Sequence, residues 1–266
     1  MLRRWLCFMA GLGLAGLCFA TDFDPFEGPE PLLVIVDFNP WGMVINADSP
    51  RVAIYRNGDM VFLDDNRKDP GYRIKRLTTE DRERLLKSAR SVFLSQGLKH
   101  RYDIRSGTDR PMTKFYFRDG GSSVATEVYG LECNPSKPFP WERDLETAPK
   151  ALLDLNASLC TLPSEGSEKW SPRYVEVMVW GYEYAKGASV PWPKDWPGLD
   201  SPRAMKRGDA YSIFMDASVM PQLQAFLSQI REKSAVVIDG KKMSVSYRMP
   251  FPSEPVWRRA FESIEQ

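Results

Sequence analysis

The sequence predicts an α+β fold in which antiparallel sheets, built from hairpins, carry a few amphipathic helices. Short apolar or alternating runs, typical of β-strands, recur along the 266 residues. Asn-Gly and Asp-Gly pairs separate several of these runs and indicate hairpin turns. Few segments have apolar residues at the spacing of a helix face. Because neighbouring strands follow one another through short turns, we expect antiparallel sheets with helices packed on them.

Hairpin signals organise the first half of the chain. Asn57-Gly58 predicts a type I′ turn, because such a turn needs both central residues at positive φ. Asp119-Gly120 predicts a second hairpin. The expected strands in this half are residues 32–38, 52–55, 60–63, 72–77, 113–117 and 124–129.

Two helices are expected in the same half. Thr78 is a candidate N-cap, Asp81 occupies the position that completes a capping box, and Gly97 ends the helix. A second helix is expected in residues 147–160. The apolar residues on one helical face are Leu85, Leu86, Ala89, Val92 and Phe93 in the first helix and Leu152, Leu155 and Leu159 in the second.

The second half has the same order of strands, helix and hairpin. Residues 223–230 predict its helix and Asp239-Gly240 its hairpin, and Ser253 is a candidate cap for a last helix. The expected strands are residues 174–184, 211–215, 235–238 and 243–248. The proline-rich residues 189–209 predict an extended loop. A diverged duplication and a chance recurrence both explain the order that the halves share.

Composition predicts two linkers between three larger segments. The resulting division is a signal peptide in residues 1–20, a linker in 21–31, an α+β half in 32–162, a second linker in 163–172 and a second α+β half in 173–266. The two halves either form separate units or pack into one compact domain.

The N-terminal segment contains the pattern G-x-G-x-x-G at residues 11–16, which marks a dinucleotide-binding turn when it follows a buried strand. Here the glycines lie inside an apolar run, residues 5–20, which Arg3 and Arg4 precede and polar residues follow. A basic start, an apolar middle and a small-residue end are the order of a secretory signal peptide. We therefore expect cleavage after Ala20 and no nicotinamide or flavin cofactor.

Three other interpretations of this segment stay open. The first is a retained membrane anchor, but the apolar run falls short of the roughly 20 residues that span a bilayer, so we expect no integral membrane span after signal removal. Residues 15–18 resemble a lipoprotein signal, which would leave the protein lipid-anchored through Cys18. Arg3-Arg4 is a partial match to a twin-arginine signal. Periplasmic or secreted location is the main expectation.

Cys133 and Cys160 are the cysteines that remain once Cys7 and Cys18 leave with the signal peptide. An even pair in an exported protein predicts a disulfide. Such a bridge closes a loop of about 28 residues and contributes roughly 3 kcal/mol in the chain-entropy model. Two buried thiols are the alternative.

Composition and motifs argue against several chemistries. The net charge is +1, which provides no long-range attraction to nucleic acid. His100 is the only histidine, so we expect neither a histidine metal site nor a Ser-His-Asp triad. Catalysis by paired carboxylates stays open, and Tyr102, Asp103 and Asp109 lie in a polar loop that is a candidate for it. The alternative is that these side chains are solvated or cap a turn.

Trp192 and Trp196 are candidate ligand-binding residues, because they lie four apart among prolines. Rigidly held indole faces stack on sugar rings or grip a proline-rich peptide. Such a site requires both indoles to be exposed and coplanar. The alternative is that both rings fold inward and attach the long loop to a sheet.

The hairpin of residues 55–61 precedes a capped amphipathic helix and a polar loop. The pieces are Tyr55-Arg56-Asn57-Gly58-Asp59-Met60-Val61, Leu77-Thr78, Leu85-Leu86, Tyr102, Asp109 and Pro111. In this order residues 51–130 resemble families of uncharacterised exported bacterial proteins, which are domains of unknown function. The resemblance implies a fold and no catalytic residue.

We therefore expect an exported, non-catalytic protein that acts in the periplasm or at the cell surface through contacts with an envelope protein or a glycan. The first alternative is a glycan- or peptide-binding module that uses the Trp192/Trp196 loop. The second is a carboxylate-dependent hydrolase, which needs two acids within about 5–10 Å in one cleft.

Overall fold

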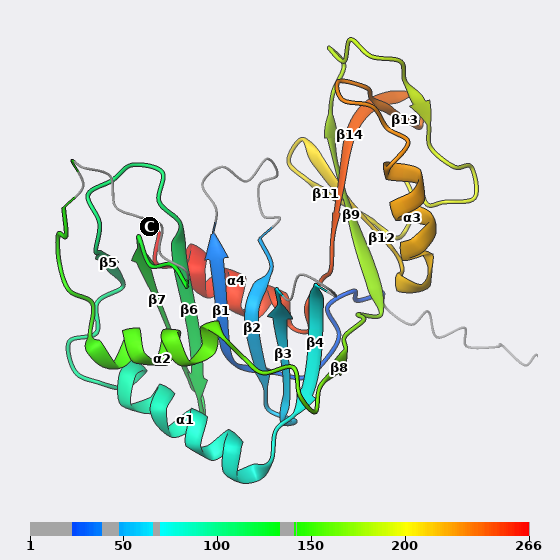
Figure 1. Ribbon diagram of the computed structural model, residues 1–266. Coiled ribbons are helices and arrows are strands. Elements are labelled where there is room, and N and C mark those ends of the chain that lie inside the picture. The colour runs from blue at the N-terminus through cyan, green and yellow to red at the C-terminus, as the bar shows by residue number, and fades with distance from the viewer. Residues whose placement is uncertain (1–22, 39–47, 66–69, 134–140, 142, 266) are drawn as a thin grey trace, which may run out of the picture.

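The computed structural model describes residues 23–38, 48–65, 70–133, 141 and 143–265. Within these residues the chain forms an eight-stranded and a six-stranded sheet together with helices α1 to α4 (Figure 1). Pairing is antiparallel in all but two short edge pairs, so the expected α+β fold is confirmed. The predicted signal peptide, including Cys18, lies outside the described residues. No helix among the described residues has the length and apolar character needed to cross a membrane.

The first sheet has the strand order β5-β7-β6-β1-β2-β3-β4-β8. Its strands are β1 (Pro31–Phe38), β2 (Pro50–Tyr55), β3 (Asp59–Asp64), β4 (Gly71–Arg76), β5 (Arg101–Asp103), β6 (Met112–Asp119), β7 (Ser122–Tyr129) and β8 (Glu168–Lys169). The continuous apolar run at β1 lies at the centre of this order, where a strand is covered on both faces.

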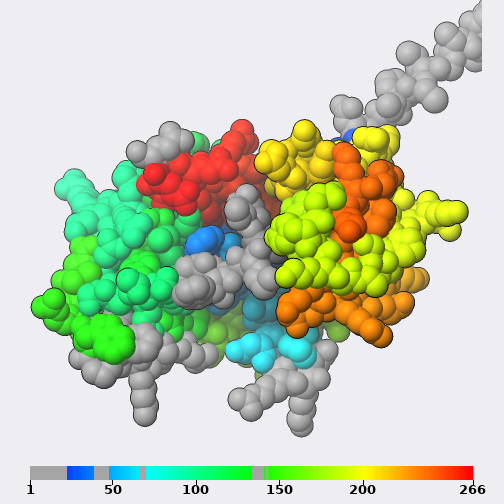
Figure 2. Space-filling model, turned by 90° about the horizontal axis from the view of Figure 1, so that it is seen from above, coloured from blue at the N-terminus to red at the C-terminus, as the bar shows by residue number. Residues whose placement is uncertain are grey.

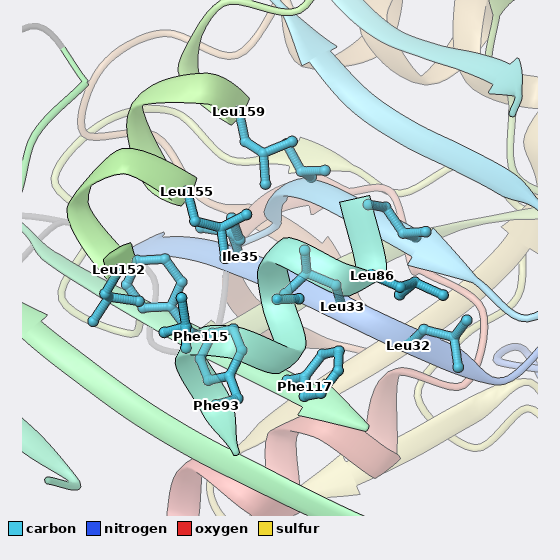
Figure 3. Packing of buried hydrophobic residues seen from close by; sticks show 14 of the residues in the cluster. Leu32, Leu33, Ile35, Leu86, Phe93, Phe115, Phe117, Leu152, Leu155 and Leu159 are labelled. Atoms are coloured by element: carbon cyan, nitrogen blue, oxygen red, sulfur yellow. The ribbon is translucent and has the colours of Figure 1, made fainter. Parts of the chain in front are cut away.

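Helices cover both faces of the first sheet. Helices α1 (Thr79–Phe93) and α2 (Lys150–Cys160) pack on the face to which Leu33 and Ile35 point (Figure 3). Helix α4 (Glu254–Glu262) packs on the opposite face, against Val34 and Val36. Because side chains alternate along a strand, β1 contributes to both layers of apolar packing.

The second sheet has the strand order β10-β13-β14-β9-β12-β11. Its strands are β9 (Tyr174–Gly181), β10 (Val190–Pro191), β11 (Ala204–Arg207), β12 (Ala210–Asp216), β13 (Val236–Ile238) and β14 (Lys241–Arg248). Helix α3 (Met220–Leu227) follows a single 3₁₀ turn, Ala217–Val219, and buries Leu223 on one face of the sheet.

The end of the chain does not stay with the second sheet. After β14 it returns to the first sheet, where Phe251, Trp257 and Phe261 are buried. Trp170, in the segment predicted to be a linker, packs on Phe251 with ring centroids 4.7 Å apart. The last helix of the predicted half 173–266 therefore packs on the predicted half 32–162, because α4 covers apolar residues that the first sheet would otherwise expose.

The predicted helix cap at Thr78 and the predicted hairpin turns can be compared with the backbone geometry. Thr78 accepts a hydrogen bond from the Asp81 amide at 3.0 Å, which confirms the predicted cap. The expected type I′ turn at Asn57-Gly58 is wrong, because Gly58 alone has positive φ, at 90°. The loop there has three residues and ends on a left-handed glycine, which is the usual three-residue alternative. Asp239-Gly240 does have positive φ at both positions, 48° and 78°.

Candidate functional site

The disulfide between Cys133 and Cys160 is confirmed. Their Cα atoms lie 5.4 Å apart, within the range that a disulfide spans without backbone movement. Cys160 is the last residue of α2, and Cys133 follows β7. The bridge therefore joins the C-terminal end of α2 to the segment that follows β7 of the first sheet.

The Trp192/Trp196 loop packs inward. Trp192 is 8% exposed, and its indole Nε1 donates a hydrogen bond to the Pro197 carbonyl oxygen at 3.0 Å. Its ring meets Trp196 at an interplanar angle of 76° and Phe226 of α3 at 87°. The exposed, coplanar pair required for stacking on a ligand is therefore not formed. Edge-to-face packing instead attaches the long loop to α3, which is the alternative weighed from the sequence.

Trp192→Phe is expected to lower the free energy of unfolding by about 1–2 kcal/mol, because the variant loses the hydrogen bond to Pro197 and part of the ring contact. Urea denaturation measures this change. Tyr184→Phe is the matched control, because Tyr184 is 80% exposed and its replacement is expected to change stability by less than about 0.5 kcal/mol. Equal stability of Trp192→Phe and the wild type would contradict the inward packing.

The polar loop residues Tyr102, Asp103 and Asp109 lie in three different environments. Tyr102 is buried in the apolar core under α1, and its hydroxyl accepts a hydrogen bond from the Lys99 amide at 3.0 Å. Asp103 pairs with Arg101 at 2.9 Å. Asp109 is exposed in a turn with φ of 63°. These positions match the structural alternative stated for this loop, in which the side chains are paired, solvated or part of a turn.

A group of four buried or mostly buried charged side chains lies where the second sheet meets α4. We name Glu176 of β9, Arg248 of β14, and Glu254 and Arg258 of α4 the junction network. Arg248 Nη2 lies 2.6 Å from Glu254 Oε1, and Arg248 also pairs with Glu176. Arg258 Nε lies 2.5 Å from the same Glu254 oxygen. The network thus links the two sheets, because α4 belongs to the packing of the first.

Neutral donors add hydrogen bonds to both carboxylates of the network. The Phe251 amide donates to Glu254 Oε2 at 3.0 Å, and the Ser212 hydroxyl donates to Glu176 Oε1 at 2.5 Å. Such partners are what a buried carboxylate needs, because an unpaired charge removed from water is strongly destabilising.

The charges of the network set the protonation of Glu254. Burial by itself raises the pKa of this carboxyl, but attraction to Arg248 and Arg258 and hydrogen bonds from Arg248 and the Phe251 amide outweigh it. The pKa of Glu254 therefore lies below its ordinary value. For Arg248, burial lowers the pKa, yet attraction to Glu254 and Glu176 raises it overall. Glu254 is accordingly ionised near neutral pH and holds no proton to transfer.

A pocket of about 170 Å³ opens above this network. We name it the junction pocket, and its lining residues are Phe26, Arg207, Glu254, Pro255, Arg258, Arg259 and Glu262. Phe26 comes from the segment just before β1, Arg207 from β11, and the other lining residues from α4. Figure 2 shows the red α4 and the yellow β11 region side by side on this face of the molecule. The predicted site residues Tyr102, Asp103, Asp109, Trp192 and Trp196 are not among them.

Sequence reasoning missed the junction network and the junction pocket. One signal was present, since Glu176 lies between valines in a strand that is otherwise apolar and buried. The Glu254/Arg258 spacing of four is a second. Among the described residues, no group of three or more His, Cys, Asp or Glu side chains is placed to hold a metal ion.

Comparisons with family models, with curated proteins and with solved structures find no match to this chain.

Proposed function

We propose that the protein is exported and works outside the cytoplasm as a non-catalytic protein, through contacts with a protein of the cell envelope. The observation that carries export is the Cys133–Cys160 disulfide. Structural disulfides persist in oxidising compartments such as the periplasm and are rare in the cytoplasm. The signal-peptide order of residues 1–20 supports the same location.

The junction network supports a non-catalytic role. A carboxylate hydrolase needs one acid that keeps its proton near neutral pH, and such an acid has a raised pKa. Glu254 has a lowered pKa instead, and two guanidinium groups occupy its oxygens. Glu176 is bound in the same way by Arg248 and Ser212. Both buried acids therefore help to hold the sheets together, and the lowered pKa of Glu254 leaves that carboxyl without a proton to donate.

A tyrosine pair with one exposed ring, Tyr184, supports contact with a protein partner. Tyr182 and Tyr184 lie in the loop after β9, with ring centroids 4.8 Å apart and ring planes at 88°. Tyr184 is 80% exposed. This loop lies at the end of the second sheet farthest from the first, in the upper part of Figure 1. Tyrosine is enriched at protein interfaces, because its ring provides large contact area and its hydroxyl a hydrogen bond.

Export is tested by expressing the full chain, with its own N-terminus, in a Gram-negative host. We expect the protein in the periplasmic extract. Its intact mass should correspond to a chain that begins at Thr21 and should be lower by two hydrogens than the mass of the reduced form. Cys18→Ser separates lipid anchoring from simple cleavage, because it changes the fractionation only if Cys18 carries lipid. Full-length protein with free thiols in the cytoplasm would overturn the proposal.

Partner contact is tested by placing a photo-cross-linking amino acid at position 184 in cells. We expect a discrete cross-linked protein species. Position 232 is the matched control, because the Glu232 side chain is 90% exposed on the same unit. Absence of a protein species at position 184, or the same species at position 232, would overturn the contact.

A further inference from the structure

We propose that the junction pocket binds a small organic monocarboxylate, whose carboxylate group is held by Arg207 and Arg259. The inference goes beyond the proposed function and does not depend on export, because it concerns a site that exists in the isolated protein.

Two guanidinium groups in the pocket have spare donors. A guanidinium has five N–H donors arranged as a fork that matches a carboxylate. Arg207 Nη2 lies 3.6 Å from Glu176 Oε1, which is an ion pair at long range rather than a good hydrogen bond. Arg259 donates its Nε to the Pro255 carbonyl oxygen at 3.1 Å, an interaction within its own helix. Their remaining donors are available to a ligand in the pocket.

The charges of the junction network cancel one another. Arg248 and Arg258 are matched by Glu176 and Glu254 within the junction network. Arg207 and Arg259 therefore add positive charge to the lining that the network does not neutralise. Arginine in this arrangement is the side chain that proteins use to recognise planar anions in two-point contacts.

Glu262 sets the charge of the ligand. Its carboxylate also lines the pocket, and it opposes one of the two additional positive charges. The lining then carries a net excess of one positive charge, which suits a ligand with a single negative charge. A phosphate dianion would meet repulsion from Glu262, because like charges in a shared site are unfavourable.

The walls of the pocket indicate the rest of the ligand. Phe26 is 9% exposed and is held by edge-on packing against Phe214 of β12, so its ring is a fixed apolar surface. Pro255 is a second apolar wall. A volume of about 170 Å³ accommodates an acid with a short apolar chain rather than a large metabolite. The ligand would touch both the second sheet and α4.

The test uses the purified, disulfide-bonded protein and isothermal titration calorimetry with sodium butyrate, at constant ionic strength. We expect saturable binding with one site. Arg207→Gln and Arg259→Gln are each expected to weaken butyrate binding by roughly tenfold or more, because each removes charged hydrogen bonds to the carboxylate. Arg231→Gln is the matched control, since Arg231 is an exposed arginine on the second-sheet unit that does not line the pocket.

Glu262→Gln separates binding from general effects on folding. This variant is expected to bind butyrate more tightly and to bind inorganic phosphate as well, because the repelling charge is gone. Damage to the fold cannot increase affinity. No saturable butyrate binding, or equal weakening by Arg231→Gln, would overturn the site, and tighter binding of inorganic phosphate than of butyrate by the wild type would overturn the assignment to a monocarboxylate.

Discussion

Arg248→Met is expected to lower the free energy of unfolding by about 3–5 kcal/mol. The substitution keeps an apolar side chain of similar length and removes the charge that Glu176 and Glu254 share. Both carboxylates are 2% exposed or less, so water cannot replace the lost partner. Two buried carboxylates would then face each other without the guanidinium between them.

The measurement is urea denaturation at pH 7. Lys150→Met is the matched control, because Lys150 pairs with Asp154 on the exposed surface of α2 and such pairs contribute about 0.3–0.5 kcal/mol. A loss of stability for Arg248→Met no larger than for Lys150→Met would contradict the role of the network in joining the sheets.

The same network makes stability depend on pH in a definite direction. The pKa of Glu254 is lower in the folded state than its ordinary value of 4.5. Its ionised form therefore stabilises the fold above about pH 4.5, and this contribution is lost as the pH falls through the folded pKa. The stability difference between the wild type and Glu254→Gln should be full at pH 7 and should shrink at pH 3.

The second large effect is expected from the disulfide. Replacing both Cys133 and Cys160 with serine should lower the free energy of unfolding by about 3 kcal/mol, because the closed loop of about 28 residues then adds its conformational freedom to the unfolded chain. Urea denaturation with and without a reducing agent measures the effect. The wild type should fall to the level of the double variant when reduced, while the double variant should not respond. A wild type unaffected by complete reduction would contradict the prediction.

Local predictions from the sequence were the most successful. The Thr78 cap, the strand at β1 and the Asp239-Gly240 turn each depend on residues that are neighbours in the chain. Their structure follows from backbone preference and from the alternation of apolar side chains. Asn57-Gly58 marks the limit of this reasoning, because the pair correctly located a hairpin but the predicted type I′ turn is wrong, since the loop has three residues and only Gly58 has positive φ.

Predictions about contact between distant segments were less successful. Trp192 and Trp196 had the spacing of a binding platform, yet Phe226 of α3 provides an apolar surface on which both rings pack. The amphipathic pattern after Ser253 predicted a helix but did not indicate its partner. That partner is the face of the first sheet opposite α1 and α2. Only the arrangement of eight strands creates this face.

The sequence by itself determined the class of the fold, its hairpins, the Thr78 cap and the cysteine pair, because these depend on residue type and short-range spacing. Only the tertiary structure decided that α4 returns to the first sheet and brings Glu254 to Arg248 and Arg259 toward Arg207. The physical reason is that a buried charge is stabilised by an opposite charge on a neighbouring segment, and that neighbour is set by the packing of the whole chain. No local pattern states which segment that will be.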